Sequence, residues 1–163
     1  MPDVLRFGDI EKDELAELLS HYCLKIIPSP ENAPIPGSFW GDEEAGLLKN
    51  RLYLRNDTPI HSILHECCHY ICMDKIRRQS LDTNAGGTHD EENSVCYLQI
   101  LLADQLSWMS RERMFTDMDS WGYSFRLGSA KAWFEQDAED TRNWLLEHDL
   151  IDSSCQPTLK LRQ

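Results

Sequence analysis

"HSILHECCHY", residues 61 to 70, carries three histidines at four-residue steps, with Glu66 directly after the middle one. On a helix, the rings of His65 and His69 lie on one face, one turn apart. That spacing lets two ring nitrogens bind a single zinc ion. Glu66 points about a quarter-turn away, from where a carboxylate reaches a bound water without binding the metal. The stretch therefore predicts two zinc ligands and a general base on one helix.

The residues around this stretch predict a long helix. Thr58 is the expected N-cap, Pro59 suits the first helical position, and the helix is expected to run to about Arg78. Lys75 and Arg77 fall in the last turn, where positive charge stabilises the helix dipole. The alternative is a helix that merely carries polar histidines on its solvent face.

His61 lies on the same stripe as the other two histidines. Its ring attachment lies about 12 Å along the helix axis from that of His69, a span that Zn–N bonds of about 2.0 Å cannot bridge. We therefore expect His61 beside the site and not among the ligands.

A third ligand must come from another part of the chain, and "THDEENSVCYLQ", residues 88 to 99, offers Glu91 and Glu92. This stretch begins a predicted helix over residues 90–108. Here the sequence resembles the gluzincin metallopeptidases, and more closely their small intracellular members, the minigluzincins. In these families a second helix carries a glutamate ligand, commonly with a small residue three positions later.

The resemblance covers about residues 45–105. The segment "GLLKNRLYLRNDTPIHSILHECCH", residues 46 to 69, looks like the substrate-side strand of that family leading into its metal helix. The resemblance favours Glu91 as the ligand, because Ser94 stands three positions after it, whereas Glu92 would put the bulkier Val95 there. Against this, Thr88 and Glu91 have the spacing of a capping box, which would occupy Glu91 with the backbone and leave Glu92 as the ligand.

A zinc hydrolase also needs a group that stabilises the oxyanion. The candidates are Tyr123, Arg126 and His89, and Tyr123 is our choice because it lies in the glycine-bounded, aromatic stretch "DSWGYSFRLGS", residues 119 to 129. The alternative is that this stretch is a hydrophobic turn packed on the core.

The expected architecture is one α+β domain over residues 1–163. It is mostly helical and zincin-like, with a small antiparallel sheet beside the HExxH helix. We expect a helix over residues 9–26 begun by Asp9, a proline-rich segment over residues 28–38, a core over residues 45–108, and a helical part over residues 110–151. A hairpin turning at Lys49-Asn50 precedes the metal helix, Ser129 caps the last helix, and residues 153–163 form a loosely held tail.

Composition limits the partners and the compartment. The formal net charge of −12 repels phosphate backbones, so we expect no nucleic acid. The chain shows no signal peptide and no apolar run of membrane-spanning length, so we expect no membrane. The six cysteines form no CxxC pair, which indicates reduced thiols in a cytoplasmic protein.

These observations predict a cytoplasmic zinc metallopeptidase that cleaves a peptide or protein substrate with one zinc ion per chain. His65, His69 and Glu91 would hold the zinc, and Glu66 would activate the water. One alternative is a zinc-binding structural or regulatory protein without peptidase activity, its site closed by Cys68 or Cys72. The other is an adaptor or toxin-related partner that binds through its acidic surface and holds no metal.

Overall fold

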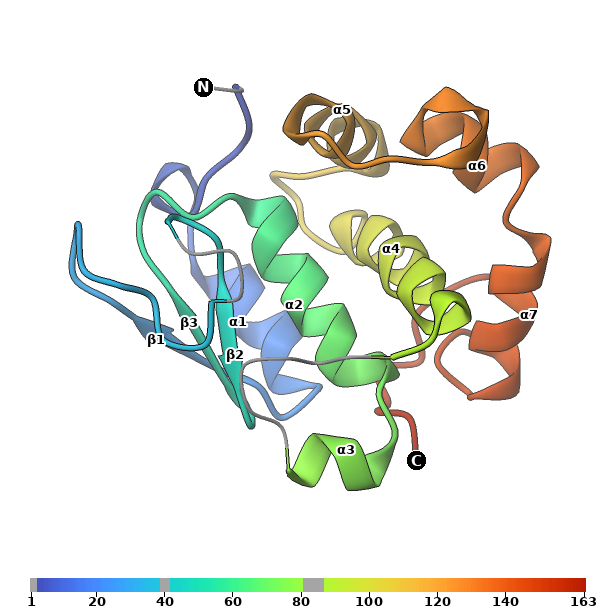
Figure 1. The fold of residues 1–163 in the computed structure, drawn as a ribbon, viewed down its shortest axis with the longest axis horizontal. Coiled ribbons are helices and arrows are strands. Elements are labelled where there is room, and N and C mark those ends of the chain that lie inside the picture. Colours follow the sequence, from blue (N-terminus) through green and yellow to red (C-terminus); the bar gives the residue numbers. More distant parts are fainter. Residues whose placement is uncertain (1–2, 39–41, 81–86) are drawn as a thin grey trace.

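The computed structural model describes residues 3–38, 42–80 and 87–163. In these ranges the chain forms seven α-helices, two short 3₁₀ helices and one three-stranded sheet, an α+β arrangement (Figure 1). In chain order the elements are η1 (Phe7–Asp9), α1 (Asp13–Ser20), β1 (Lys25–Pro28), β2 (Gly46–Leu48), β3 (Arg51–Leu54), α2 (Ile60–Cys72), α3 (Lys75–Gln79), α4 (His89–Ala103), α5 (Arg111–Trp121), η2 (Arg126–Gly128), α6 (Ala130–Gln136) and α7 (Glu139–Glu147).

The sheet has the strand order β1-β3-β2 and is mixed. β2 and β3 form the predicted hairpin, antiparallel and turning at Lys49 and Asn50. The prediction of a purely antiparallel sheet is wrong, because β1 pairs with β3 in parallel, with Lys25 opposite Arg51. Such a pairing joins segments far apart in the chain, and no local pattern reveals it.

The predicted helix over residues 9–26 is shorter in the structure. Asp9 ends η1, and α1 covers only Asp13–Ser20. Cys23 has a φ of 62°, a left-handed conformation that an α-helix cannot continue through. Ile26 and Ile27 follow in β1, where branched side chains are favoured.

The metal-motif helix is also shorter than predicted. α2 ends at Cys72, and Pro59 stands at the N-cap position in place of the expected Thr58. The predicted run to Arg78 is broken at Asp74, whose carboxylate accepts a 2.9 Å hydrogen bond from the Arg77 backbone N–H and thereby caps α3.

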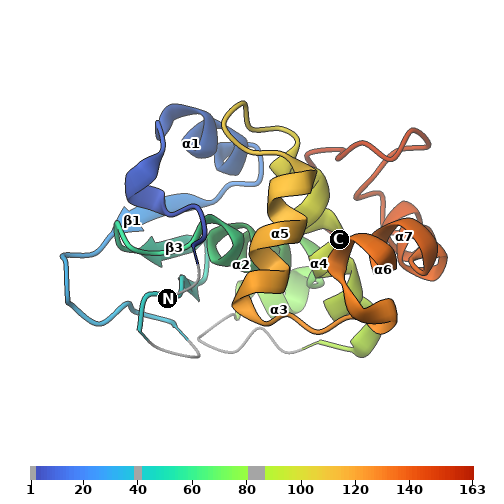
Figure 2. The same ribbon diagram turned by 90° about the horizontal axis from the view of Figure 1, so that it is seen from above.

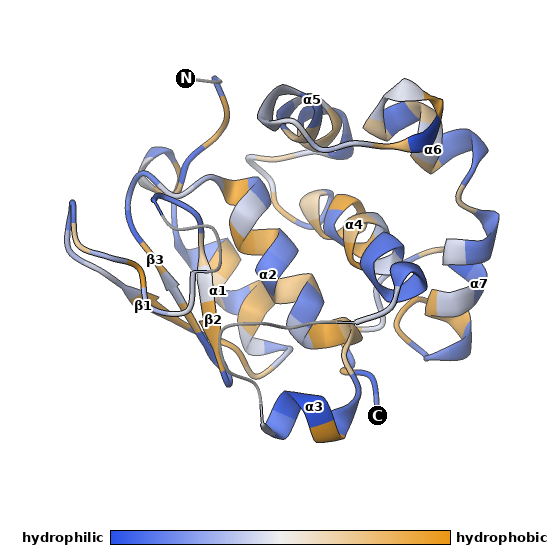
Figure 3. Ribbon diagram, viewed as in Figure 1, coloured by the Kyte–Doolittle hydropathy of each residue, from blue (hydrophilic) through white to orange (hydrophobic). Residues whose placement is uncertain are grey.

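α2 is the central element of the fold. It lies between the sheet and α4, while α6 and α7 lie on the far side of α4 (Figures 1 and 2). The backbone N–H of Ala45 donates a 2.9 Å hydrogen bond to the Ser62 hydroxyl, which ties α2 to the residue before β2. Hydrophobic residues collect in the sheet, α2 and α4, whereas α3, α5 and α7 are mainly hydrophilic (Figure 3). In the described ranges, no helix has the length and apolarity needed to cross a membrane.

The proline-rich segment passes along β2. A Cβ built on Gly46 would lie 2.0 Å from the carbonyl oxygen of Pro36 and 2.5 Å from the backbone nitrogen of Ser38. Residues 36–38 therefore lie directly against this edge strand. Residue 28 itself is the last residue of β1, so the segment is not wholly irregular.

The C-terminal part of the chain departs from prediction in two ways. Ser129 caps α6 as predicted, its hydroxyl accepting from the Ala132 N–H at 3.1 Å, but the last helix is split into α6 and α7. The tail is not loosely held, because the backbone N–H of Arg162 donates to the Ile71 carbonyl at 3.0 Å. The tail lies against the end of α2.

Candidate metal centre

Three side chains from α2 and α4 converge at one point. The Nε2 atom of His65 lies 3.3 Å from one carboxylate oxygen of Glu92, and the Nε2 atom of His69 lies 3.3 Å from the other. One ligand atom from each residue can be chosen so that all three lie within 4.8 Å of one another. In the described part of the chain, this is the one group of three His, Cys, Asp or Glu side chains with that geometry.

The structure brings Glu92, and not Glu91, to the histidines. The side chain of Glu91 is 3% exposed and is bound by two guanidinium groups, those of Arg77 at 2.6 Å and Arg162 at 3.0 Å. Adjacent helical residues point about 100° apart, so only one of the two carboxylates can face α2's histidines. The Glu91 carboxylate, the preferred ligand in the prediction, therefore lies away from the histidines, and Glu92, the predicted alternate, lies beside them.

The predicted capping box between Thr88 and Glu91 explains only part of the position of Glu91. The Thr88 hydroxyl accepts a 3.2 Å hydrogen bond from the Glu91 backbone N–H, so Thr88 does cap α4. The Glu91 carboxylate, however, makes no capping-box hydrogen bond to the Thr88 backbone N–H; it binds arginines from α3 and the tail. Ser94 is fully buried, as expected for close helix packing, but it does not direct Glu91 to the histidines.

α2 is open to solvent at one place. Ten of its residues are buried, and the three that are not are His65, Glu66 and His69. No described residue donates a hydrogen bond to the Glu66 carboxylate. Burial raises the pKa of Glu66 to about 7, and the negative charges of Glu92 and Glu44 act in the same direction. A partly shielded carboxylate with a pKa near neutrality suits the role of a general base.

Gln99 orients His65. Its side-chain oxygen lies 2.9 Å from His65 Nδ1, while its amide nitrogen donates to the His61 carbonyl oxygen at 2.9 Å. This arrangement makes the oxygen the acceptor, so Nδ1 of His65 carries the proton and Nε2 is left for the site. Gln99 was not predicted from the sequence, although it stands seven residues after Glu92, two turns along the same face of α4.

Tyr123 lies beside His65, with the two ring centroids 5.7 Å apart. Its hydroxyl is 3.1 Å from His61 Nδ1 and 3.5 Å from the Gln99 amide nitrogen. Burial raises the pKa of Tyr123 to about 12, so the phenol keeps its proton at neutral pH. His61 is itself buried, and this burial lowers the pKa of its ring to about 3. Unlike His65 and His69, His61 has Tyr123 as its partner and not the Glu92 carboxylate.

The other two oxyanion candidates have polar partners outside the site. The side chain of Arg126 is 82% exposed and pairs with Asp137 at 3.2 Å. His89 is exposed at the start of α4, where its Nε2 lies 3.4 Å from the Asn93 amide nitrogen. Of the three candidates, Tyr123 alone has a ring packed against a histidine of the site.

One wall of the site comes from residues that the sequence did not indicate. The Trp121 indole N–H donates to Glu44 at 3.1 Å, and its ring lies 4.9 Å from the ring of His61. Glu44 precedes β2 and Trp121 ends α5, so this contact joins the two sides of the site.

The cysteines of α2 do not reach the site. Cys68 and Cys72 are fully buried, and burial raises the pKa of both thiols well above the usual value. Buried thiols with raised pKa values resist forming the thiolates that bind zinc. The alternative in which one of them closes a structural zinc site is therefore not supported.

The donor set at the site fits zinc. Two imidazole nitrogens and one carboxylate are the ligands of open zinc sites, and tetrahedral bonds of 2.0–2.1 Å place neighbouring donor atoms roughly 3.3 Å apart. Burial lowers the pKa of His65, but Tyr123, Cys96 and Glu92 together raise it well above its usual value, because the contact between Nε2 and the Glu92 carboxylate requires a proton or a cation between them. His69 Nδ1 is buried and, in the described part of the chain, has no hydrogen-bond partner.

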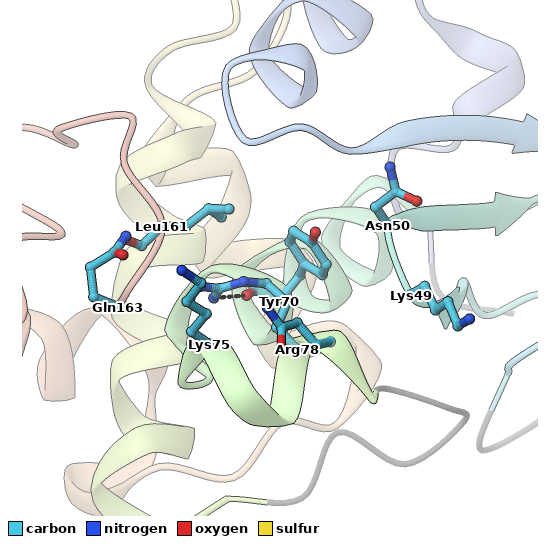
Figure 4. Close-up of a pocket in the computed structure, with 8 residues that line it drawn as sticks. Lys49, Asn50, Tyr70, Lys75, Arg78, Leu161 and Gln163 are labelled. Carbon is cyan, nitrogen blue, oxygen red and sulfur yellow. Dashed lines mark hydrogen bonds between the residues drawn. The ribbon is translucent and has the colours of Figure 1, made fainter.

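A separate cavity of about 480 Å³ lies at the C-terminal end of α2 (Figure 4). Tyr70, Arg78 and Leu161 are among its lining residues, and no residue of the metal centre is. This cavity therefore belongs to the junction of α2, α3 and the tail, and the candidate metal centre lies on another part of α2.

Comparison of the chain with protein-family models, with curated proteins and with solved structures finds no match to any of them.

Proposed function

We propose that this protein is a zinc-dependent hydrolase that cleaves peptide bonds, built on a zincin-like domain of minigluzincin type. In this proposal His65, His69 and Glu92 hold one zinc ion, and Glu66 is the general base. The observation that carries it is the approach of Glu92 to both histidines, beside Glu66 on the partly exposed face of α2.

A bound zinc ion would supply a Lewis acid that lowers the pKa of water towards about 7. Glu66 takes the proton of the attacking water and returns it to the leaving amine. Gln99 keeps Nε2 of His65 directed at the site. The protonated hydroxyl of Tyr123 stabilises the negative charge that develops on the carbonyl oxygen of the substrate.

Peptide as the substrate class is supported by the resemblance of residues 45–105 to the minigluzincins and by the pairing of a base with an open zinc site. All six cysteines are free, and one of them, Cys23, is exposed, which suits a reducing compartment such as the cytoplasm. Against a purely structural zinc site stands the count of ligands, since such sites close with four protein donors.

Elemental analysis of protein purified without chelators tests the metal. We expect one zinc per chain, lost in His65→Ala and in His69→Ala and kept in the matched control His21→Ala, because His21 is exposed at the end of α1. Stoichiometric zinc of unchanged affinity in either site variant would refute the assignment.

Peptide turnover tests the reaction. The zinc-loaded protein is incubated with a mixed peptide library, and new termini are identified by mass spectrometry. Glu66→Gln keeps the shape but cannot accept the proton, so we expect retained zinc and a rate lower by about 10²–10⁴-fold. Turnover by Glu66→Gln at the parent rate would show that another group is the base, and zinc without any turnover would favour a regulatory or structural role.

A further inference from the structure

The proposed zinc site depends on a carboxylate from the first turns of α4, and the residue before it is held unusually firmly. Arg77 makes two hydrogen bonds to Glu91, at 2.9 Å and 2.6 Å, and Arg162 makes a third at 3.0 Å. Removing a carboxylate this deeply from water is costly unless it is paired and hydrogen-bonded. Two guanidinium groups satisfy that requirement here.

The two arginines reach Glu91 from different parts of the chain. Arg77 lies on α3, whose start is fixed by the cap at Asp74. Arg162 lies in the tail, and it also donates to the Cys72 carbonyl at 3.1 Å. The ion pairs therefore link the first turn of α4 to α3 and to the last residue of α2.

The tail is itself anchored to α2 and α3. The guanidinium of Arg78 donates to the backbone carbonyl of Arg162 and, at 3.0 Å, to that of Tyr70 (dashed line in Figure 4). In the same view Leu161 and Gln163 lie beside Arg78, along the cavity between α3 and the tail. Arg162 thus acts from a fixed position, and it joins the two helices that supply the metal ligands.

Gly87 completes the enclosure of Glu91. Its φ is 113°, and a Cβ built there would lie 2.0 Å from Glu91 Oε2. The backbone approaches the carboxylate as closely as it does only because no side chain intervenes.

Glu92 has no comparable support. Its side chain is 48% exposed, and among the described residues it forms ion pairs with the two histidines, to which His89 adds only an electrostatic contribution. The direction of Glu92 is then set by the rotation of the first turns of α4 about the helix axis. Because Glu91 lies about 100° away on the same turn, fixing Glu91 fixes that rotation.

We propose that Arg77 and Arg162 are positioning residues of the metal centre, which hold Glu91 so that Glu92 faces His65 and His69. The pairing also neutralises one of two adjacent carboxylates, so that a single free negative charge is presented to the cation. This inference rests on the proposed function, since it requires that the site binds zinc.

A double-mutant cycle on zinc affinity tests the proposal. Zinc affinity is measured by competition with a chromophoric chelator for the unaltered chain, Arg162→Ala, Glu92→Ala and the double variant. We expect Arg162→Ala to weaken binding by about 10–100-fold, the range usual for groups that orient a ligand. In the Glu92→Ala background the same change should have no further effect, because Arg162 acts through Glu92.

Arg111→Ala is the matched control, because Arg111 also pairs with one carboxylate, Asp104 at 2.6 Å, away from the site. It should leave zinc affinity unchanged in both backgrounds. Arg162→Lys keeps a cation and should recover part of the loss. Cobalt substitution provides a second readout, since loss of a carboxylate ligand changes the visible spectrum of the bound ion.

Equal effects of Arg162→Ala in the two backgrounds, or no effect in either, would overturn the positioning role while leaving the zinc site in place. Failure of the unaltered chain to bind zinc would overturn the proposed function together with this inference. If Arg162→Ala does not fold, as judged by circular dichroism, the cycle is run with Glu91→Gln, which keeps the side-chain shape and removes the charge; additivity there would equally refute the role.

Discussion

At the scale of single residues, the state of His65 is set by one amide. The Gln99 oxygen accepts from Nδ1 of His65, while its nitrogen is committed to the His61 carbonyl. Because both ends of the Gln99 amide are hydrogen-bonded, the amide cannot rotate, and the ring of His65 has one orientation with a proton on Nδ1.

Gln99→Leu should weaken zinc binding by about 10–100-fold, because leucine fits the buried space but cannot accept the Nδ1 proton. Chelator competition measures the effect. Tyr123→Phe is the control, since it removes a hydroxyl that Gln99 also approaches and leaves the bond to His65 intact. Equal zinc affinity of Gln99→Leu and the parent would show that Gln99 does not orient the ligand.

Tyr123→Phe should affect the reaction and not the metal. Loss of one oxyanion donor lowers kcat by about 10²–10³-fold, whereas zinc affinity should stay at the parent value. Tyr97→Phe serves as the comparison, because Tyr97 is a buried tyrosine that packs against Phe134 in the core. If Tyr123→Phe kept the parent kcat, the hydroxyl would not be an oxyanion donor, and its role would be limited to its contact with His61.

The sequence alone was enough to place the three side chains of the HExxH motif together. It was not enough to decide which of the two adjacent glutamates faces them. HExxH spacing brought His65, Glu66 and His69 together, and the structure keeps them as the open face of α2. The choice between Glu91 and Glu92 depended on Arg162, which lies 71 residues after Glu91, and no local pattern links the two. Gln99, by contrast, could have been predicted, because its spacing from Glu92 places both residues on the same face of α4.

At the scale of elements, patterns between residues close in the sequence predicted the hairpin correctly, whereas the pairing of strands distant in the sequence was not predicted. The alternation of Leu52 and Leu54 with polar neighbours predicted β3 and its hairpin, and both leucines are fully buried. β1 was missed because its first two residues were predicted as the end of a helix and its last residue as part of the proline-rich segment; Lys25 to Pro28 becomes a strand only by pairing with β3. The break between α2 and α3 was not predicted, because basic residues stabilise the last turn of one long helix and of a separate short helix equally well. The hydrogen bond by which Asp74 caps α3 marks the start of a separate helix.

The junction between residue 87 and α4 gives an element-scale prediction. Gly87→Ala should push the Glu91 carboxylate away from its arginines and weaken zinc binding. Gly128→Ala is a matched control, since Gly128 also has a positive φ, of 91°, but a Cβ there meets nothing within 4 Å. Both variants carry backbone strain, so both should lose thermal stability. Only Gly87→Ala should lose zinc affinity as well, and equal zinc affinity in the two would contradict the role given to Gly87.

At the scale of the whole molecule, the candidate metal centre lies where distant parts of the chain meet. α2 and α4 carry the proposed ligands, Glu44 before β2 is in contact with Trp121 at the end of α5, and the tail binds Glu91 next to the proposed ligand Glu92. A ligand that joins α2 to α4 acts on the principal helix contact of the fold. Binding at this point should therefore stabilise the entire chain and not only the site.

Zinc should raise the melting temperature, since it binds the folded chain and the three ligands are dispersed on unfolding. At a free zinc concentration 100 times Kd the stabilisation is about 2.7 kcal/mol. For a chain of this size roughly 2–4 °C accompanies each kcal/mol, so Tm should rise by about 5–10 °C. Chelator should reverse the shift, and the exposed-site control His21→Ala should behave like the parent. His69→Ala should show neither response, because the remaining two donors hold zinc weakly; a zinc-dependent Tm of parental size in that variant would mean that the stabilising ion binds elsewhere.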